Sequence, residues 1–205
     1  MGATWSENKM TVPKVVFRYS FVYDDAWLMA MNKKLKTNGN KESLKCSKSI
    51  QKKWDKIARN VLIRMEKISG LEWQVPYLVC YLVNCCPRAA LSDPLTIEMM
   101  KDENLVIAIL IHELGHVILF QNRKILPTNI DKKYGLNNKE SRELVATSIQ
   151  KLVYQEIFTA KTSKRYIDFY KRWDIYRKIF RIIQKEGAEN IIKDEVKQWQ
   201  EKNSK

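Results

Sequence analysis

The most apolar stretch of the chain runs from Leu105 to Phe120, with apolar side chains on almost every face of the helix it would form. Asp102 and Glu103 precede this stretch, and acidic residues are favourable near the positive end of a helix dipole. A helix that is apolar nearly all round belongs in the interior of a protein. The pattern therefore predicts a buried central helix that begins near Asp102.

Other stretches repeat apolar residues every three or four positions, which is the spacing of amphipathic helices. The predicted helices run from Ile50 to Gly70, from Asn137 to about Ala160 and from Lys164 to Lys185, and a last polar helix follows Gly187. Asn137 and Glu140 have the spacing of a helix-capping pair, which supports the start of the second helix.

Shorter runs rich in β-branched and aromatic residues predict strands. These runs are Thr11 to Tyr23, Pro76 to Val83 and Leu95 to Ile97. After the first strand we expect a short helix over 24–36 and a polar loop over 36–48. Together the elements predict an α+β protein, in which a small mixed sheet packs on the buried helix and a mostly helical part follows.

The charge balance and the cysteines limit the partners and the compartment. Lysine and arginine number 37 against 23 aspartate and glutamate, a formal net charge of +14, which favours acidic partners but equally describes a solvated lysine-rich surface. Cys46, Cys80, Cys85 and Cys86 lack zinc-ribbon spacing, so free thiols in a reducing compartment are the simplest account. No signal peptide or transmembrane segment is recognisable, and we expect a cytoplasmic protein.

The central helix contains the only two histidines of the chain, His112 and His116, within the sequence His-Glu-Leu-Gly-His. Residues four apart on a helix share a face, so both imidazoles can bind one metal ion. Zinc is the expected metal, because it binds neutral imidazole in a tetrahedral shell that in enzymes leaves one position to water. Glu113 then lies beside that water and can accept its proton. Gly115 predicts that another element packs closely against this helix.

Two histidines leave a catalytic zinc ion one protein ligand short. Since the chain has no third histidine, a carboxylate must complete the set. The helix after the motif offers Glu140 and Glu143, twenty-four and twenty-seven positions beyond His116, and both are within reach.

At this point the chain resembles the gluzincin metallopeptidases, in which His-Glu-x-x-His is followed by a glutamate on a second helix. Several branches write the second motif as Glu-x-x-Ala followed by Asp or Asn. The segment Glu143-Leu144-Val145-Ala146 matches that motif, whereas Thr147 departs from it. The departure leaves open which group orients a ligand histidine: Thr147, a backbone carbonyl or another acid.

The resemblance implies a zincin-like fold and assigns the roles in the site. Zinc would be held by His112, His116 and Glu143, with Glu140 in reserve, and Glu113 would be the catalytic base. The family likeness also implies that the segment from Arg88 to Met99 forms the rim along which an extended substrate pairs. Tyr154, Tyr134 and Arg142 are candidates for stabilising the oxyanion.

We expect one domain over residues 1–205: an N-terminal strand, helix and loop (1–48), a catalytic core (49–160) and a basic helical C-terminal extension (161–205). The leading hypothesis is a zinc-dependent endopeptidase that acts on an extended protein or peptide substrate. One alternative is a module that binds nucleic acid or an acidic surface through the basic, aromatic stretch Lys164 to Lys185. Another is a latent or regulatory metallopeptidase whose N-terminal segment occupies the cleft.

Overall fold

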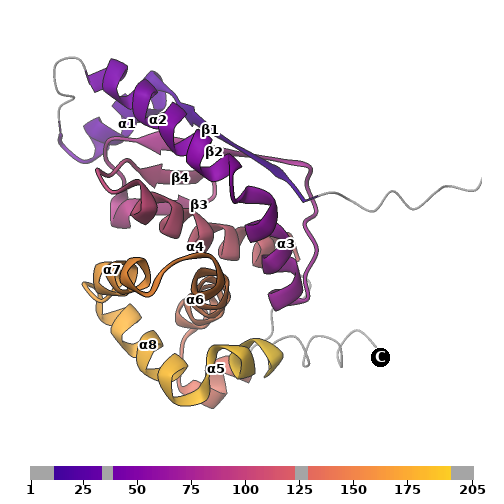
Figure 1. The fold of residues 1–205 in the computed structure, drawn as a ribbon. Coiled ribbons are helices and arrows are strands. Elements are labelled where there is room, and N and C mark those ends of the chain that lie inside the picture. Colours follow the sequence, from indigo (N-terminus) through magenta and orange to yellow (C-terminus); the bar gives the residue numbers. More distant parts are fainter. Residues whose placement is uncertain (1–11, 34–38, 123–128, 195–205) are drawn as a thin grey trace, which may run out of the picture.

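A computed structural model describes residues 12–33, 39–122 and 129–194 of this chain (Figure 1). Helix α4 (Glu103–Gln121) lies in the middle, between a four-stranded sheet and a group of helices. The helices before it are α1 (Phe21–Ala30), α2 (Gly39–Asp55) and α3 (Ala58–Ser69), and those after it are α5 (Asn129–Tyr134), α6 (Asn138–Ile157), α7 (Ala160–Tyr170) and α8 (Asp174–Glu186). The predicted α+β fold, with a small mixed sheet and a mostly helical C-terminal half, is confirmed.

The sheet has the strand order β1-β2-β4-β3. Its strands are β1 (Lys14–Tyr19), β2 (Tyr77–Val83), β3 (Ala90–Ser92) and β4 (Leu95–Glu98). The first three strands in this order are parallel, and β3 runs antiparallel to β4. A short 3₁₀ turn, η1 (Pro87–Ala89), leads into β3. Strands β1 and β3 are therefore the two edges of the sheet.

Helix α2 lies along the β1 edge and closes it. The side-chain carbonyl of Gln51 accepts a hydrogen bond from the backbone N–H of Phe17 at 2.8 Å, and its amide nitrogen donates to the carbonyl of Val15 at 3.2 Å. One glutamine thus pairs a donor and an acceptor that an edge strand would otherwise leave to water or to another chain.

The central helix α4 is buried as its sequence predicts. Asp102 caps it by accepting a hydrogen bond from the N–H of Asn104 at 3.0 Å, and residues 106–119 are buried except for His116. By length and composition α4 could also cross a membrane, but here most of it is enclosed by the sheet and by helices of the same chain.

Helices α4 and α6 approach closely at Gly115. A Cβ atom at this position would lie 3.3 Å from both the Cα and the carbonyl oxygen of Ala146. Because both contacts are to backbone atoms, a larger residue would have to push the helices apart. The close packing expected at Gly115 is confirmed, and it brings the start of α6 to the histidine face of α4.

The start of α6 follows the capping pair seen in the sequence. The side chain of Asn137 accepts hydrogen bonds from the N–H groups of Lys139 and Glu140 at 3.0 Å each, and the Glu140 carboxylate accepts one from the N–H of Asn137 at 3.0 Å. This capping box sets the first turn of the helix, and Glu143 lies one turn further on.

The predictions for 11–48 were wrong in two places. The first strand ends at Tyr19, because Ser20 caps a helix that begins at Phe21 and ends at Ala30 rather than running over 24–36. The stretch 39–48, predicted as part of a loop, belongs to α2. Its buried face starts with Ser43 and Ser47 and continues with Ile50 and Trp54, and the two small polar residues hide the helical period from a hydrophobicity pattern.

Two predicted long helices are each divided in the structure. The helix that begins near Ile50 is interrupted at residues 56–57, which separate α2 from α3. The stretch Lys164 to Lys185 is divided at residues 171–173, which separate α7 from α8. The ring of Trp173 lies at this turn, 5.3 Å from that of Phe169 and 6.1 Å from that of Tyr176.

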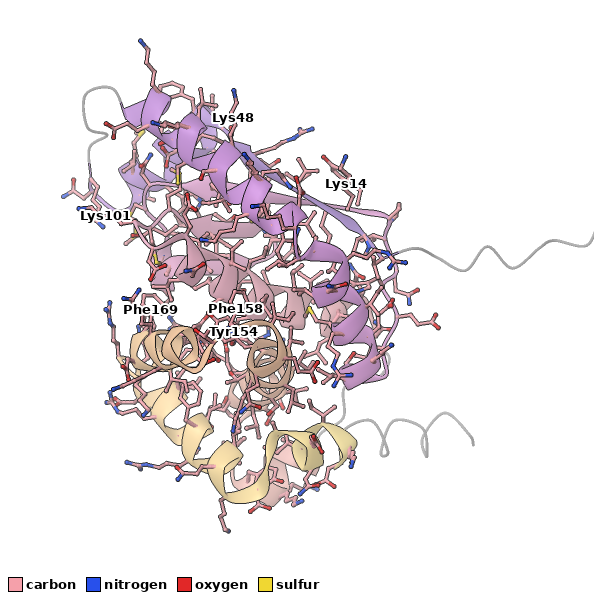
Figure 2. All side chains as sticks on the ribbon, viewed as in Figure 1. Lys14, Lys48, Lys101, Tyr154, Phe158 and Phe169 are labelled. Carbon is pink, nitrogen blue, oxygen red and sulfur yellow. The ribbon has the colours of Figure 1, made fainter. Side chains whose placement is uncertain are left out.

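The aromatic residues of α7 and α8 are largely used inside the protein. Tyr166, Phe169 and Tyr170 are buried, and the ring of Tyr154 stacks on that of Phe158 at 4.2 Å. In Figure 2, Tyr154 and Phe158 lie where α6 and α7 meet and Phe169 lies at α7, whereas lysines such as Lys48 project outwards. Few rings of α7 and α8 are left to stack on nucleic-acid bases, whereas most of the basic residues from Lys164 to Lys185 are exposed.

Candidate metal centre

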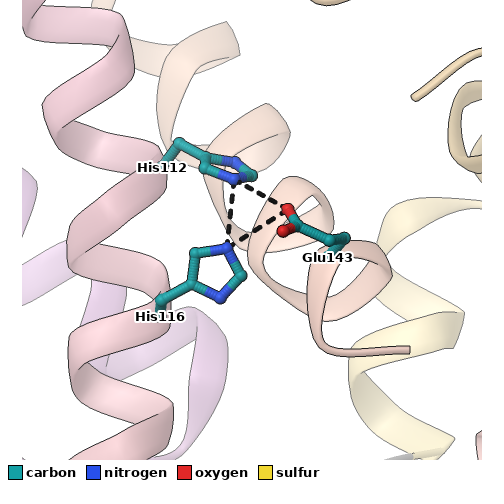
Figure 3. Close-up of side chains that lie close together, drawn as sticks. All are labelled: His112, His116 and Glu143. Carbon is teal, nitrogen blue, oxygen red and sulfur yellow. Dashed lines mark hydrogen bonds and ion pairs between the residues drawn. The ribbon is translucent and has the colours of Figure 1, made fainter. Parts of the chain in front are cut away.

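Three side chains from α4 and α6 converge on one point (Figure 3). The Nε2 atoms of His112 and His116 are 3.1 Å apart. The Oε2 atom of Glu143 lies 3.1 Å from the first nitrogen and 3.2 Å from the second. The three atoms therefore form a nearly equilateral triangle.

The size and chemistry of this triangle fit a metal ion. Tetrahedral ligands at 2.0–2.1 Å from a zinc ion are separated from one another by roughly 3.3 Å, close to the distances found here. Two imidazoles and a carboxylate are also a donor set that divalent zinc accepts. Among the described residues these three form the group of histidine, cysteine and acidic side chains that could hold a metal ion.

Of the two glutamates that the sequence left open, only Glu143 joins the histidines. Glu140 is occupied in the capping box, and both of its carboxylate oxygens also accept hydrogen bonds from Lys178 Nζ at 3.1 Å. These contacts lower the pKa of Glu140, the bond from the Asn137 N–H most of all. The difference follows from helix geometry, since Glu143 is rotated by about 300° from Glu140 and lies one turn further along.

A hydrogen-bond chain fixes the tautomer of His112. The amide nitrogen of Gln150 donates to the carbonyl of Ala108 at 2.6 Å, and a carbonyl can only accept, so the amide oxygen must face the opposite way. That oxygen lies 3.1 Å from His112 Nδ1 and also accepts a hydrogen bond from the Tyr166 hydroxyl at 2.6 Å. When His112 is neutral, its proton therefore stays on Nδ1, which leaves the Nε2 lone pair free to bind a metal.

Gln150 therefore orients His112, a role for which Thr147 was one candidate. The Thr147 hydroxyl is buried and has no hydrogen-bond partner among the described residues. Gln150 follows Glu143 by seven positions, or two helical turns, so both side chains lie on the same face of α6. This spacing was visible in the sequence, but nothing in the sequence showed that a glutamine on this face would meet a histidine of α4.

The charges of the site are strongly coupled. Burial by itself raises the pKa of the Glu143 carboxyl, but hydrogen bonds and charge interactions with the two histidines outweigh it and hold that pKa far below its usual range. Burial lowers the pKa of His116, while the hydrogen bond and the charge of Glu143 raise it more, so the result is an increase. Glu143 is accordingly an ionised, acceptor-only ligand group.

Glu113 lies next to the triangle without being part of it. Its side chain is 8% exposed and lines the same cleft as His116 and Glu143. Burial raises the pKa of Glu113, and the negative charge of Glu143 adds to the effect, while the two histidines oppose it. A carboxylate whose pKa is raised accepts a proton more readily than one in water.

Tyr176 also belongs to the site, although the sequence analysis did not name it as a candidate. The hydroxyl of Tyr176, in the first turn of α8, donates a hydrogen bond to Glu143 Oε2 at 2.8 Å and lies 3.2 Å from His112 Nε2. Burial, followed by the charge of Glu143, raises the pKa of Tyr176 far above its ordinary value, so the hydroxyl keeps its proton. In the sequence Tyr176 lies in the predicted amphipathic helix Lys164 to Lys185, whose spacing gave no sign of a role near the histidines.

The residues named beforehand as oxyanion donors lie in different places. Arg142 lines the cleft beside Glu143. The hydroxyls of Tyr134 and Tyr154 are buried and have no hydrogen-bond partner among the described residues, and neither residue lines the cleft.

The triangle formed by His112, His116 and Glu143, called the metal triangle below, opens into a cleft of about 770 Å³. Its walls come from the sheet edge, with Ala90, Leu91 and Ser92 of β3, from the start of α6, and from the α7–α8 turn with Tyr170, Trp173 and Tyr176. The segment expected to form a substrate rim, Arg88 to Met99, therefore contributes its first residues to the cleft. The C-terminal part, expected as an extension, contributes an entire wall.

Comparison with protein-family models, with curated proteins and with solved structures finds no match for this chain. The likeness to gluzincins consequently rests on the arrangement of His112, His116 and Glu143 on two packed helices.

Proposed function

We propose that this protein is a zinc-dependent endopeptidase that hydrolyses peptide bonds of an extended polypeptide. The observation that carries the proposal is the triangle of His112, His116 and Glu143 with Glu113 beside it, at the wall of a cleft bordered by a sheet edge. A structural metal site would not need a neighbouring buried carboxylate that faces an open cleft.

His112, His116 and Glu143 are the residues that would hold the ion. Zinc in such a site supplies a Lewis acid that acidifies the attacking water and polarises the substrate carbonyl. Gln150 keeps His112 in the tautomer that exposes Nε2, and Tyr166 holds Gln150 in place.

Glu113 is the proposed general base. It takes a proton from the attacking water and later passes it to the nitrogen of the leaving amine. Among the described residues no hydrogen bond to the Glu113 carboxylate is found, and the side chain lines the cleft, so its oxygens are available for this transfer. The hydroxyl of Tyr176 is the proposed donor to the carbonyl oxygen, on which negative charge develops in the transition state.

The substrate would add a strand to β3. Ala90, Leu91 and Ser92 both form the sheet edge and line the cleft, so an extended chain paired with them would pass the metal triangle. An open edge accepts a segment from the middle of a polypeptide, which favours endopeptidase activity.

Two further roles remain proposals. The exposed basic residues of α7 and α8 could recruit a nucleic acid or an acidic surface, and such binding would weaken with rising salt. Latency through the N-terminal segment concerns residues 1–11, which lie outside the described residues.

The deciding experiment compares Glu113→Gln with the wild type and with Glu189→Gln, a control on the exposed surface. We expect Glu113→Gln to fold, to retain one zinc per chain and to cleave an unstructured protein about a thousand- to ten-thousandfold more slowly. Metal analysis, with proteolysis measured with and without a chelator, gives both quantities. Near wild-type cleavage by Glu113→Gln would overturn the proposal.

A further inference from the structure

The cleft next to the metal triangle has three basic side chains that no acidic group neutralises. Arg88, Lys139 and Arg142 line the cleft and are exposed. In the part of the chain that the structure describes, none of the ion pairs involves these three residues. They come from two walls, since Arg88 precedes β3 whereas Lys139 and Arg142 lie one turn apart on α6.

Of the four acidic residues of the cleft, three are paired with other groups of the protein, and Glu113 is the buried carboxylate proposed as general base. Glu143 is bonded to the histidines and Tyr176, and Glu113 is buried beside them. Glu140 is bonded to Asn137 and Lys178. Asp174, the fourth, pairs with Arg177. The cleft therefore offers positive charge to whatever enters it.

Arg142 is already oriented for such a ligand. Its Nε atom donates a hydrogen bond to the carbonyl of Asn138 at 3.2 Å, one turn back along α6. This bond holds the guanidinium group at the cleft wall, and no hydrogen bond in the described part of the chain uses its two terminal nitrogens. Two parallel N–H groups of this kind match the two oxygens of a carboxylate.

Arg88 occupies a backbone conformation that an arginine adopts only with strain. Its φ is 57° and its ψ is 20°, in the left-handed region, and Ala89 follows with a φ of 72°. Glycine would adopt these angles without the clash between Cβ and the carbonyl oxygen. An arginine kept in such a position at a cleft wall suggests that its side chain has a function there.

We propose that the cleft selects polypeptide segments that carry a carboxylate close to the bond to be cleaved, bound by Arg142 and Lys139 on one wall and by Arg88 on the other. This inference rests on the proposed function and specifies its substrate class. The carboxylate could belong to an Asp or Glu side chain or to the end of a chain, and both would meet the same three cations.

The test uses one peptide that the full-length protein cleaves, with Glu, Gln or Lys placed in turn at each position within three residues of the cleaved bond. At the best position we expect Glu to exceed Gln by about fivefold in kcat/KM, the factor that one well-formed exposed ion pair gives. Arg142→Gln should bring this ratio close to one. The control Arg181→Gln, on the outer face of α8, should leave it unchanged.

Two further experiments identify the source of the carboxylate and test the role of Arg88. Peptides with a free or an amidated C-terminus separate the two sources, because a preference confined to the free acid identifies the chain end as the carboxylate. Arg88→Gly should weaken the preference for Glu while the midpoint of thermal unfolding stays the same or rises. A fall in that midpoint without a change in preference would remove Arg88 from the proposed subsite.

Binding separates this inference from the proposed function. In Glu113→Gln, fluorescence anisotropy should show about fivefold tighter binding of the Glu peptide than of the Gln peptide, and the difference should shrink with added salt. Cleavage by the wild type without any preference for an acidic residue overturns the inference and leaves the peptidase intact. Preferential binding of the Glu peptide with no cleavage supports the inference and overturns the peptidase.

Discussion

The two edges of the sheet differ in what covers them. At the β1 edge, Gln51 of α2 bonds to the backbone of Val15 and Phe17. At the β3 edge, Ala90, Leu91 and Ser92 pair on one side with β4 and face the cleft on the other. The metal triangle lies at the second edge and not at the first.

This difference separates stability from function within one small sheet. An open edge is a liability, because it can pair with other chains, and proteins usually cover it or twist it away. Here the edge far from the metal triangle is closed by a side chain, and the edge beside it is very short and remains accessible. We therefore expect substitutions on the β3 side of the sheet to affect metal binding and cleavage. Substitutions on the β1 side should affect only the stability of the fold.

The largest effect is expected from Glu143→Ala, which removes one corner of the metal triangle. Loss of a residue that hydrogen-bonds to a metal ligand can lower metal affinity by roughly 100-fold. Loss of a ligand itself should lower zinc affinity by more than this and abolish cleavage. Equilibrium dialysis with metal analysis measures the affinity.

Glu140→Ala is the matched control for this prediction. It removes a capping glutamate that also pairs with Lys178, so the protein should lose about 1 kcal/mol of stability and keep its zinc. If Glu140→Ala lost the metal and Glu143→Ala kept it, the ligand assignment would be reversed.

An intermediate effect is expected from Gln150→Leu. The leucine cannot accept the His112 Nδ1 proton, so the imidazole loses its fixed tautomer and zinc affinity should fall about 10- to 100-fold. Competition with a chromophoric chelator measures the affinity. Gln184→Leu, at an exposed position of α8, should have no effect on it. Unchanged affinity in Gln150→Leu would mean that the chain through Tyr166 has no influence on the metal site.

The smallest effect on the metal site is expected from Gln51→Leu, which opens the β1 edge. Two backbone groups lose their partners, and the free energy of unfolding in urea should fall by about 1–3 kcal/mol. Zinc affinity and kcat/KM of the folded protein should equal those of the wild type. A loss of zinc from folded Gln51→Leu would show that the two edges of the sheet are not independent.

Much of the fold could be predicted from the sequence where the signal lies within a few helical turns. The apolar run before His112 predicted the buried helix, and the spacing of Asn137 and Glu140 predicted the start of α6. The spacing of four between His112 and His116 predicted that their side chains would meet. These features depend on hydrogen bonds and side-chain contacts between neighbours along the chain, which the sequence displays directly.

Predictions from periodicity failed where small or aromatic residues carried the pattern. Ser43 and Ser47 face the core in α2, although a hydrophobicity pattern counts them as polar. The stripe from Tyr166 to Ile183 looked continuous, yet the helix is divided at residues 171–173. A helical period shows which residues share a face, but not where the helix breaks.

From the sequence came the two histidines, the neighbouring Glu113 and two candidate glutamates, of which the resemblance favoured Glu143. The structure brings Glu143 and not Glu140 to the histidines, pairs Gln150 with His112 across 38 residues, and brings Tyr176 to a histidine 64 positions away. These contacts depend on how α4, α6 and α8 pack together. That packing is set by close approaches such as Gly115 against Ala146, which involve atoms far apart in the sequence.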